Sequence, residues 1–340
     1  MIGNFNELAC TQVQKVIESG RFEPEKDVNC GLVTLRIESQ PTKIMSRELQ
    51  GINAINHLGL QNLQTLLMTI IQYKGFSVAV KLNMKLNDQT IIVDQARCPP
   101  LVNQNVINSM KQYGAALSLR ERVMRWNEEE ISVPLCPYIQ AHSYNGKIFL
   151  TNLNCLLPND LSIKNDSLTQ FRENFVHFYE KKLPCTLFVA EEDAANDSCE
   201  LELLHASKHL VNNYIPQIIS KLDNLDIIIF DSEHFTEVLH DHGINIRYLG
   251  VIAANTLVPH VKEQALIEIV ARCFKQHFNK VLRYSVLHFI QVNASKIEDE
   301  LRLVAVNLVQ SIMRPSVQVI IFLIRVLGAE LERAKFRVSI

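Results

Sequence analysis

Glycine is scarce in this 340-residue sequence, at 11 residues, and the phosphate-binding loops built on glycine are missing. Neither a G-x-G-x-x-G fingerprint nor a Walker loop occurs, which excludes nucleotide binding through either motif. The Gly-x-Ser-x-Gly elbow of hydrolases is missing too, and no cysteine lies in a recognised catalytic signature. On these grounds we expect no enzymatic activity and no cofactor.

The sequence also lacks a strong net charge, a long apolar run and a targeting segment. Lys and Arg number 34 and Asp and Glu 36, so no overall basic field would hold nucleic acid. The longest apolar run, residues 317–327, is interrupted by Gln318 and Arg325 and is too short to span a bilayer. The N-terminus resembles neither a signal peptide nor a transit peptide. We therefore expect a cytoplasmic protein with no transmembrane segment.

Cysteine pairs at metal-site spacing are missing as well. None of the 8 cysteines forms a C-x-x-C pair, which indicates reduced thiols in a reducing compartment. His205 and His209 give half of a zinc-protease pattern without its glutamate. His234, His240 and His242 lie near acidic residues at irregular spacing that matches no standard site. A metal enzyme or hydrolase is therefore the least favoured function class, and no metal site is predicted.

What the sequence does contain is a first part rich in strand patterns. Alternation of β-branched residues predicts a strand over residues 31–37 and a hairpin over 63–82. Residues 90–93 would add a neighbouring strand. An Asn-Gly dipeptide, the strongest short turn signal, predicts a second hairpin over residues 139–153.

Apolar residues at helical spacing dominate the second part. Residues 227–230 fit either a strand or a buried helix. Strands grouped before helices, without β–α–β alternation, predict the α+β class, with a β-rich part over 1–160 and a helical part over 161–340. The segments with helical patterns are 6–19, 102–123, 166–179, 200–221, 261–281, 294–312 and a last helix after Pro315.

The densest cluster of specific side chains lies between residues 240 and 250. Gly243 after His242 is typical of a helix end, where glycine tolerates the left-handed conformation and His suits the helix dipole. Taken alone, the segment predicts a capped helix followed by a buried connection. The residues of interest are His242, Gly243, Asn245, Arg247, Tyr248 and Gly250.

A second candidate is a basic segment that carries the single Trp of the chain. On a helix, Arg122 and Arg125 would lie three apart and could contact phosphates or stacked RNA bases, together with Arg120 and Trp126. The alternative is a solvated helix face balanced by the glutamates at 128–130, and the near-neutral chain favours that alternative.

Several segments, in this order, resemble the central domain of the clustered-mitochondria (CLU) family. They cover most of the chain, from about residue 40 to residue 285. The residues that carry the resemblance are those of 46–51, the hairpin turn 73–76, Gly146 and Lys147 with Pro158 and Asp160, residues 242–250 and the helix 268–272.

The resemblance implies a Clu-domain-like fold and a cytosolic protein needed for normal mitochondrial distribution. It also implies association with mRNAs for mitochondrial proteins, and it implies no enzymatic activity. Family members also carry an N-terminal ubiquitin-like region and C-terminal tetratricopeptide repeats, which we do not find in this sequence. Asn152 and Cys155 stand where the family typically has an Asp and an Arg.

We therefore expect a non-catalytic interaction or scaffold domain that belongs to a larger protein assembly linked to mitochondria. The alternative is an mRNA-associated protein of mitochondrial biogenesis and distribution. Within residues 240–250, we expect Asn245 and Arg247 to join the β-rich and helical parts by hydrogen bonds. His242 is expected to be a helix-end group and not a metal ligand.

Overall fold

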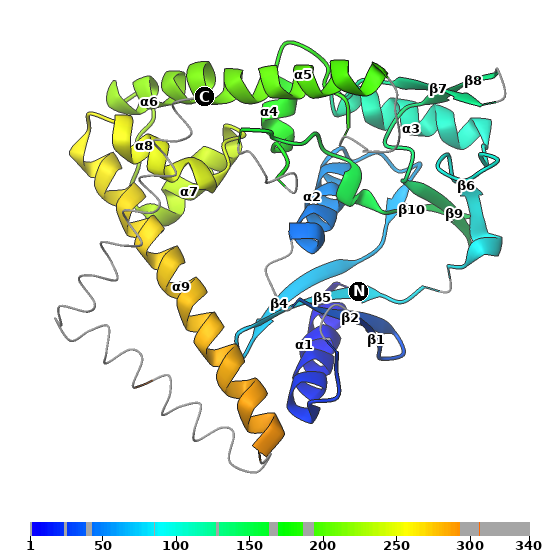
Figure 1. The fold of residues 1–340 in the computed structure, drawn as a ribbon, viewed down its shortest axis with the longest axis horizontal. Helices are drawn as coiled ribbons and strands as arrows, with labels where there is room; N and C mark the ends of the chain where they lie inside the picture. Colours follow the sequence, from blue (N-terminus) through cyan, green and yellow to red (C-terminus); the bar gives the residue numbers. More distant parts are fainter. Residues whose placement is uncertain are drawn as a thin grey trace.

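The structure of the protein is a computed structural model, and it confirms the α+β class. The described strands lie between residues 27 and 151, and the described chain beyond them is mainly helical (Figure 1). The described residues are 2–23, 26–38, 43–84, 86–126, 129–162, 169–185, 194–292 and 306.

The elements follow the chain from an N-terminal helix through three groups of strands to a long last helix. The strands are β1 (Asp27–Asn29), β2 (Val33–Glu38), β3 (Gln64–Thr65), β4 (Met68–Tyr73), β5 (Phe76–Leu82), β6 (Ile91–Val93), β7 (Arg122–Trp126), β8 (Glu129–Val133), β9 (Gln140–Tyr144) and β10 (Lys147–Thr151). The helices are α1 (Ile2–Ser19), α2 (Lys43–His57), η1 (Asp88–Thr90), α3 (Gln104–Ala116), η2 (Leu153–Cys155), α4 (Glu173–Phe178), α5 (Ala194–His209), the π-helical turn η3 (Leu210–Tyr214), α6 (Ile215–Asp223), α7 (Ser232–Asp241), η4 (Ile246–Tyr248), α8 (Leu249–Asn255) and α9 (Pro259–Val292).

The strands form two sheets and a separate ribbon. The first sheet has the order β1-β2-β5-β4 with antiparallel neighbours. The second has the order β3-β10-β9-β6, in which only the β3–β10 pair is parallel. Strands β7 and β8 pair as a two-stranded ribbon.

Both predicted hairpins are present, but the first arm of the first hairpin is shorter than predicted, since β4 begins at Met68 and Gln64 and Thr65 form β3 of the second sheet. Tyr73 pairs with Phe76 across the β4–β5 turn, and Tyr144 pairs with Lys147 across the β9–β10 turn. Asn145 has φ +49° in the second turn, and the glycine after it also has a positive φ. Two successive positive φ values match the right-handed twist of the flanking strands, which explains the strength of the Asn-Gly signal.

The predicted third strand, 90–93, pairs elsewhere than expected. It forms β6, but β6 joins β9 of the second sheet and not the β4–β5 hairpin. Residues 46–56, which carry no predicted element, lie in α2. Gly51 in that helix touches η2 so closely that an added Cβ would lie 2.2 Å from the Leu153 carbonyl oxygen. The pairing of β6 with β9 and the packing of α2 against η2 both join segments that are distant in sequence.

The helix predicted over 102–123 is confirmed up to Ala116 and is wrong beyond it. Helix α3 ends at Ala116, Ser118 has φ +56°, and the chain then enters β7. Gly114 lies inside α3 and does not interrupt the helix. A Cβ there would lie 2.7 Å from the Pro134 carbonyl oxygen, so this glycine permits close packing and does not end the helix.

Two further segments differ from expectation. The helix predicted over 166–179 is shorter and begins at Glu173 as α4, because Gln170 forms a bridge with Asn159. Residues 163–168, its predicted start, lie outside the described residues. Residues 227–230 form neither the strand nor the buried helix considered, and Ile228 is 60% exposed in the loop before α7.

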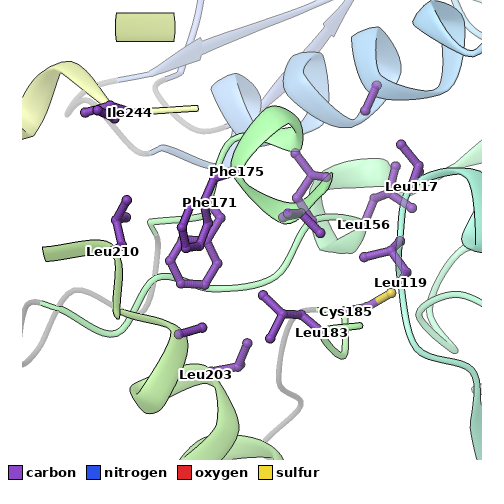
Figure 2. Packing of buried hydrophobic residues seen from close by; sticks show 14 of the residues in the cluster. Leu117, Leu119, Leu156, Phe171, Phe175, Leu183, Cys185, Leu203, Leu210 and Ile244 are labelled. Carbon is purple, nitrogen blue, oxygen red and sulfur yellow. The ribbon is translucent and has the colours of Figure 1, made fainter. Parts of the chain in front are cut away.

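Two clusters of buried apolar side chains make up the core. The larger one joins α2, α3 and the second sheet to α4–α8 and the start of α9 (Figure 2). The smaller one packs α1 against the first sheet. The larger cluster holds residues from both sides of position 160, and the division at that position stays a prediction.

Helix α9 reaches both clusters. Val261, Ala265 and Ile269 near its start belong to the larger cluster, and Val286 near its end belongs to the smaller one. A 34-residue helix is about 50 Å long, so one rigid element crosses most of the molecule (Figure 1). A Cβ added to Gly75 in the β4–β5 turn would lie 2.3 Å from the α9 backbone.

Among the helices that the structure describes, none is both long enough and apolar enough to cross a membrane. The predicted helix over 294–312, apart from residue 306, and the predicted helix after Pro315 lie outside the described residues, so both remain predictions.

Candidate functional site

The segment 240–250 begins as a capped helix end. Helix α7 finishes at Asp241, and His242 follows as the C-cap residue. The His242 ring donates from Nδ1 to the Val238 carbonyl oxygen at 2.8 Å, which satisfies one of the last carbonyls of the helix. Gly243 has φ +69°, the left-handed conformation that favours glycine after a C-cap.

Gly243 is also the point at which α7 meets α4. A Cβ at this position would lie 2.2 Å from the Phe175 backbone nitrogen and 2.7 Å from its Cα. Ile244 then enters the core with 0% exposure, on the same side as Phe171 and Phe175 (Figure 2). This turn therefore needs glycine for two reasons, its backbone angle and its distance from α4.

The polar centre of the segment is Arg247 with Tyr248, which face Asp160 from the other half of the chain. Arg247 forms an ion pair with the Asp160 carboxylate through Nη2. The Tyr248 hydroxyl donates to the same carboxylate oxygen at 2.5 Å and accepts from Arg247 Nη2 at 3.0 Å. The guanidinium also lies over the Tyr248 ring, 4.8 Å from its centre.

Ser162 completes this group. Its hydroxyl lies 2.7 Å from the Tyr248 hydroxyl, and its backbone N–H donates to the other Asp160 oxygen at 3.0 Å. Since Tyr248 has a single hydroxyl proton and donates it to Asp160, Ser162 must be the donor in their contact. The backbone of Leu161 is held in turn by Ser207 Oγ on α5, at 2.8 Å.

This group is closed off from solvent. Tyr248 is 0% exposed and Asp160 1%, and the Arg247 side chain is 12% exposed. A substrate cannot reach the carboxylate or the hydroxyl in this arrangement. A buried, hydrogen-bonded ion pair can hold residues 158–162 against η4, and this is what the geometry provides.

Asn245 and Gly250 contribute to the local backbone structure of this segment. Asn245 precedes η4 as its N-cap residue without a side-chain capping bond, and its carbonyl accepts from Tyr248 N at 3.0 Å. Gly250 is buried in the first turn of α8. The expected contact between the two parts of the chain is thus made by Arg247, whereas Asn245 contributes a local backbone bond.

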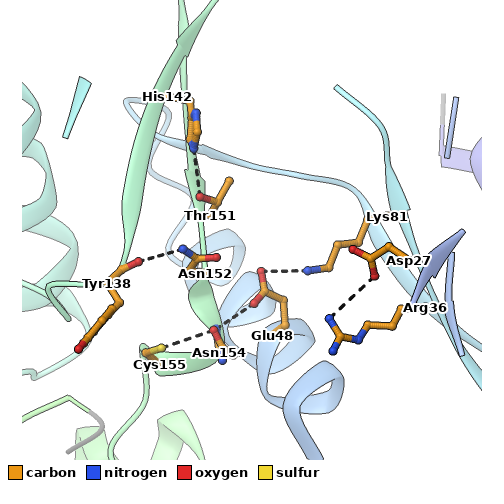
Figure 3. Close-up of polar contacts among 10 residues, drawn as sticks. All are labelled: Asp27, Arg36, Glu48, Lys81, Tyr138, His142, Thr151, Asn152, Asn154 and Cys155. Atoms are coloured by element: carbon orange, nitrogen blue, oxygen red, sulfur yellow. Dashed lines mark hydrogen bonds and ion pairs between the residues drawn. The ribbon is translucent and has the colours of Figure 1, made fainter. Parts of the chain in front are cut away.

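The two positions that depart from the family pattern lie after β10. Asn152 adopts φ +61° and donates from its side chain to the Tyr138 carbonyl oxygen at 3.1 Å (Figure 3). Cys155 is buried in η2, with Sγ 3.4 Å from the Asn154 side-chain oxygen. Neither contact reaches residues 240–250.

Cys155 belongs to a buried group of thiols. A hydrogen bond from Cys136 lowers the pKa of Cys155, and the Arg47 guanidinium lowers it further. Burial raises the pKa of Cys136, and it raises that of Cys185 to about 12. The eight cysteines, all within the described chain, form no disulfide.

Glu48, next to Arg47 on α2, contacts both η2 and strand β5 of the first sheet. It accepts from the Asn154 N–H at 3.1 Å and lies 3.6 Å from Lys81 Nζ on β5 (Figure 3). Arg47 itself is 7% exposed and donates toward Asn159 at 3.5 Å. In the sequence, Arg47 and Glu48 are noted only within the segment that resembles the family. Their burial depends on tertiary packing, which no local pattern reveals.

A small cleft opens between α2 and the start of α4. Its volume is about 90 Å³, too little for a nucleotide or similar cofactor. His57 Nδ1 lies 2.6 Å from the Glu173 carboxylate on its wall. Sequence reasoning missed this pair because 116 residues separate its members. The lining residues are Gln50, Asn53, His57, Leu157, Arg172, Glu173 and Asn174.

The basic segment is not the helix that was predicted. Residues Arg122 to Trp126 form strand β7, so the helical spacing on which the prediction relied does not occur there. Arg120 is bound to Glu202 at 2.8 Å, and both Arg120 and Arg122 donate to Cys199 Sγ on α5. The side chains of Arg125 and Trp126 lie outside the described part.

The histidines do not gather into a metal site. Within the described residues, no group of three or more His, Cys, Asp or Glu side chains is placed to hold a metal ion. His205 Nδ1 lies 2.9 Å from the Tyr179 hydroxyl, and His234 packs against the Phe230 ring.

Two family models match the chain. Residues 34–162 match the family described as Clustered mitochondria, and residues 226–301 match the family described as Translation initiation factor eIF3 subunit 135. The segment 240–250, ascribed to the first family from the sequence, lies within the second match. Asp160 and Ser162 are at the end of the first match and Arg247 and Tyr248 lie in the second, so the buried group joins the two.

Individual relatives of this chain are named as clustered mitochondria proteins. The chain is 37% identical over 103 residues to the Clustered mitochondria protein homolog of Ajellomyces capsulatus, covering 28% of this chain and 8% of that protein. It is 34% identical over 99 residues to the Clustered mitochondria protein of Arabidopsis thaliana, covering 29% and 7%. This chain therefore covers less than a tenth of the length of these relatives. No solved structure matches it.

Proposed function

Because this chain belongs to the clustered mitochondria family, we propose that it is a non-catalytic interaction domain within a larger protein assembly linked to mitochondria. The observation that carries the proposal is the buried group at residue 160. The Asp, Arg, Tyr and Ser side chains that could serve chemistry are used to join the two matched regions, away from solvent.

One further observation supports a role in an assembly. The second match is to a family whose name describes it as a subunit, that of a translation initiation factor.

The test is isolation of the full chain from its native source at its natural level. A tag at one terminus, mild crosslinking and quantitative mass spectrometry would identify proteins present in comparable molar amount. We expect at least one such protein and co-sedimentation of part of the chain with mitochondria. Isolation of a monomer with nothing at comparable amount would overturn the proposal.

An mRNA-associated role is the alternative. It rests on the family resemblance and on the basic segment around β7, where Arg120 and Arg122 are already engaged with Glu202 and Cys199. Ultraviolet crosslinking followed by sequencing of bound RNA decides between the two. Enrichment that is lost on reversing the charge of Arg122 and Arg125 would favour this alternative, and no enrichment over background would remove it.

A further inference from the structure

Four large apolar side chains protrude from two neighbouring loops at one end of the helical part. Leu225, Ile228 and Phe230 lie between α6 and α7, and Leu257 lies between α8 and α9. Their exposed fractions are 66%, 60%, 73% and 85%. We call these four residues the 225–257 patch.

The two loops are tied together by hydrogen bonds. The Asp223 carboxylate accepts from Thr256 Oγ1 at 2.6 Å and from the Leu257 N–H at 3.1 Å. The His260 Nε2 lies 3.2 Å from the Ile229 carbonyl oxygen. These bonds hold the two loops next to each other, and the four apolar side chains on them are all exposed.

The backbone at Leu225 adds a second sign that this surface is built for contact. Leu225 follows the C-cap of α6 with φ +64°, a position where glycine or asparagine is usual. A leucine there costs free energy in the folded state and leaves most of its side chain in water. An interaction with this side chain would offset both costs.

The other exposed large apolar residues lie apart from this surface. Single exposed apolar residues are normal, whereas a contiguous group on ordered loops marks a binding surface. The others are on different elements: Leu32, Leu60, Val102, Val123, Tyr138, Phe178, Leu201, Ile267, Tyr284 and Val306.

The charges around the patch are mainly acidic. The segments 221–234 and 256–263 expose Asp226, Asp231, Glu233 and Glu263 against the basic residues Lys221 and Lys262. The matching occupant is therefore apolar with basic flanks.

Residues 314–340 of this chain have that composition. Nine of the eleven residues in 317–327 are Val, Ile, Leu or Phe. The segment 314–340 carries two glutamates and five basic residues, namely Arg314, Arg325, Arg333, Lys335 and Arg337. Such a segment needs an apolar surface, and the 225–257 patch has the complementary character.

The chain is long enough to make this contact. Helix α9 ends at Val292 about 50 Å from its start, and Leu257 lies two residues before that start. From Val292 to Val317 there are 25 residues, which can span up to about 80 Å when extended and still about 50 Å if residues 294–312 form the predicted helix.

We propose that residues 314–340 bind the 225–257 patch of the same chain. The apolar stretch 317–327 covers Leu225, Ile228, Phe230 and Leu257, and its basic flanks face the acidic rim. This contact is within the chain, so the proposal does not rest on the proposed function of the domain.

Photocrosslinking in the full-length chain tests the proposal. Benzoylphenylalanine replaces Phe230, whose 73% exposure leaves the fold undisturbed. A one-to-one mixture of ¹⁴N- and ¹⁵N-labelled protein separates crosslinks within a chain from those between chains. We expect crosslinked peptides from 314–340 with a single isotope label, and at least fivefold fewer of them when the photoprobe is at the remote residue Leu32.

Substitutions define the contact further. Leu257→Asp and Ile321→Asp should each reduce the crosslink from position 230 at least fivefold, whereas Leu257→Met and Ile321→Met should retain it. Crosslinks that join ¹⁴N and ¹⁵N chains would overturn the proposal in favour of a second copy. It also fails if probes at both 225 and 230 give no crosslink to 314–340, or capture another protein instead.

Discussion

A single carboxylate, Asp160, holds two regions of the chain together. It accepts from Tyr248 and pairs with Arg247, 88 and 87 positions away in sequence, and almost none of it reaches water. A buried charge is stable only while its partner is present, since removing one member leaves the other desolvated and unpaired. The contribution of Asp160 therefore shows best when it is removed and Arg247 is kept.

We predict that Asp160→Asn lowers the free energy of unfolding by about 3–5 kcal/mol, the usual cost of breaking a buried pair. Urea denaturation followed by circular dichroism measures this change. The matched control is Glu23→Gln in the exposed Glu23–Lys26 pair, which should change stability by less than about 1 kcal/mol. Equal effects of the two substitutions would show that residue 160 does not hold the regions together.

His240, next to the α7 end, should make stability depend on pH. Burial lowers its pKa to about 4, with Arg172 and Arg272 adding to this effect and Asp241 opposing it. In the unfolded chain the pKa is about 6.5, so the unfolded state binds more protons between these values. Because the ring is half-buried and solvent screening weakens the effect, stability should fall by about 1–2 kcal/mol as the pH is lowered from about 6.5 to 4.

His240→Gln tests this pH dependence. The variant should flatten the curve of unfolding free energy against pH over that window, relative to the wild-type protein. The exposed His177 provides the control, and His177→Gln should leave the wild-type curve unchanged. Parallel curves for wild type and His240→Gln would contradict the prediction.

At the scale of elements, glycines set how closely segments pack. Gly51 brings α2 against η2, Gly75 brings the β4–β5 turn against α9, and Gly243 brings the end of α7 against α4. In each case the nearest atom is backbone, which cannot rotate away as a flexible side chain can. Glycine at these positions therefore sets the distance between neighbouring elements, in addition to any role in a turn.

Gly243→Ala should therefore destabilise the protein more than the same change at Gly146. Both glycines have a positive φ, +69° and +72°, but a Cβ at Gly146 meets no atom within 4 Å. The backbone penalty, about 1–2 kcal/mol, is common to both variants. Only Gly243→Ala should show an additional loss of at least about 2 kcal/mol in urea denaturation, since overpacking costs about 1–3 kcal/mol. Similar losses in both variants would mean that α4 moves aside easily.

For the whole molecule, α9 is the element that connects the two apolar clusters. Its first turns pack with α7 and α8, and its last turns pack with α1 and the first sheet. Its middle section includes the exposed residue Ala271. A break at this point should leave the larger cluster intact and deprive the smaller one of Val286.

We predict that Ala271→Pro lowers amide protection in α1 and in strands β2 and β5. The proline removes a helical hydrogen bond and costs about 3 kcal/mol in a helix interior. Hydrogen exchange with mass spectrometry should show this loss, with protection in β9 and β10 largely kept. Ala271→Ser is the control and should change little. Equal loss in both sheets would show that the clusters unfold as one unit regardless of α9.

The sequence alone was sufficient for the fold class, the two hairpin turns and the resemblance to the clustered mitochondria family that residues 34–162 carry. The turns with positive φ, the β-branched strands and the capped end of α7 are encoded within a few neighbouring residues. The end of the helix predicted over 102–123 was wrong because the chain there forms β7. This strand pairs with β8, and its Arg122 contacts α5, which is distant in sequence. Local propensity cannot anticipate such partners.

What only the tertiary structure decided is which residues meet. The sheet that β6 joins, the closing of Asp160 on Arg247 and Tyr248, and the exposure of the 225–257 patch are absent from any local pattern. The physical reason is that turns and caps are stabilised within one segment, whereas buried pairs and exposed patches depend on how segments far apart in sequence pack together. Residues 240–250 illustrate both, since glycine and histidine end the helix locally while Arg247 and Tyr248 acquire their role from Asp160.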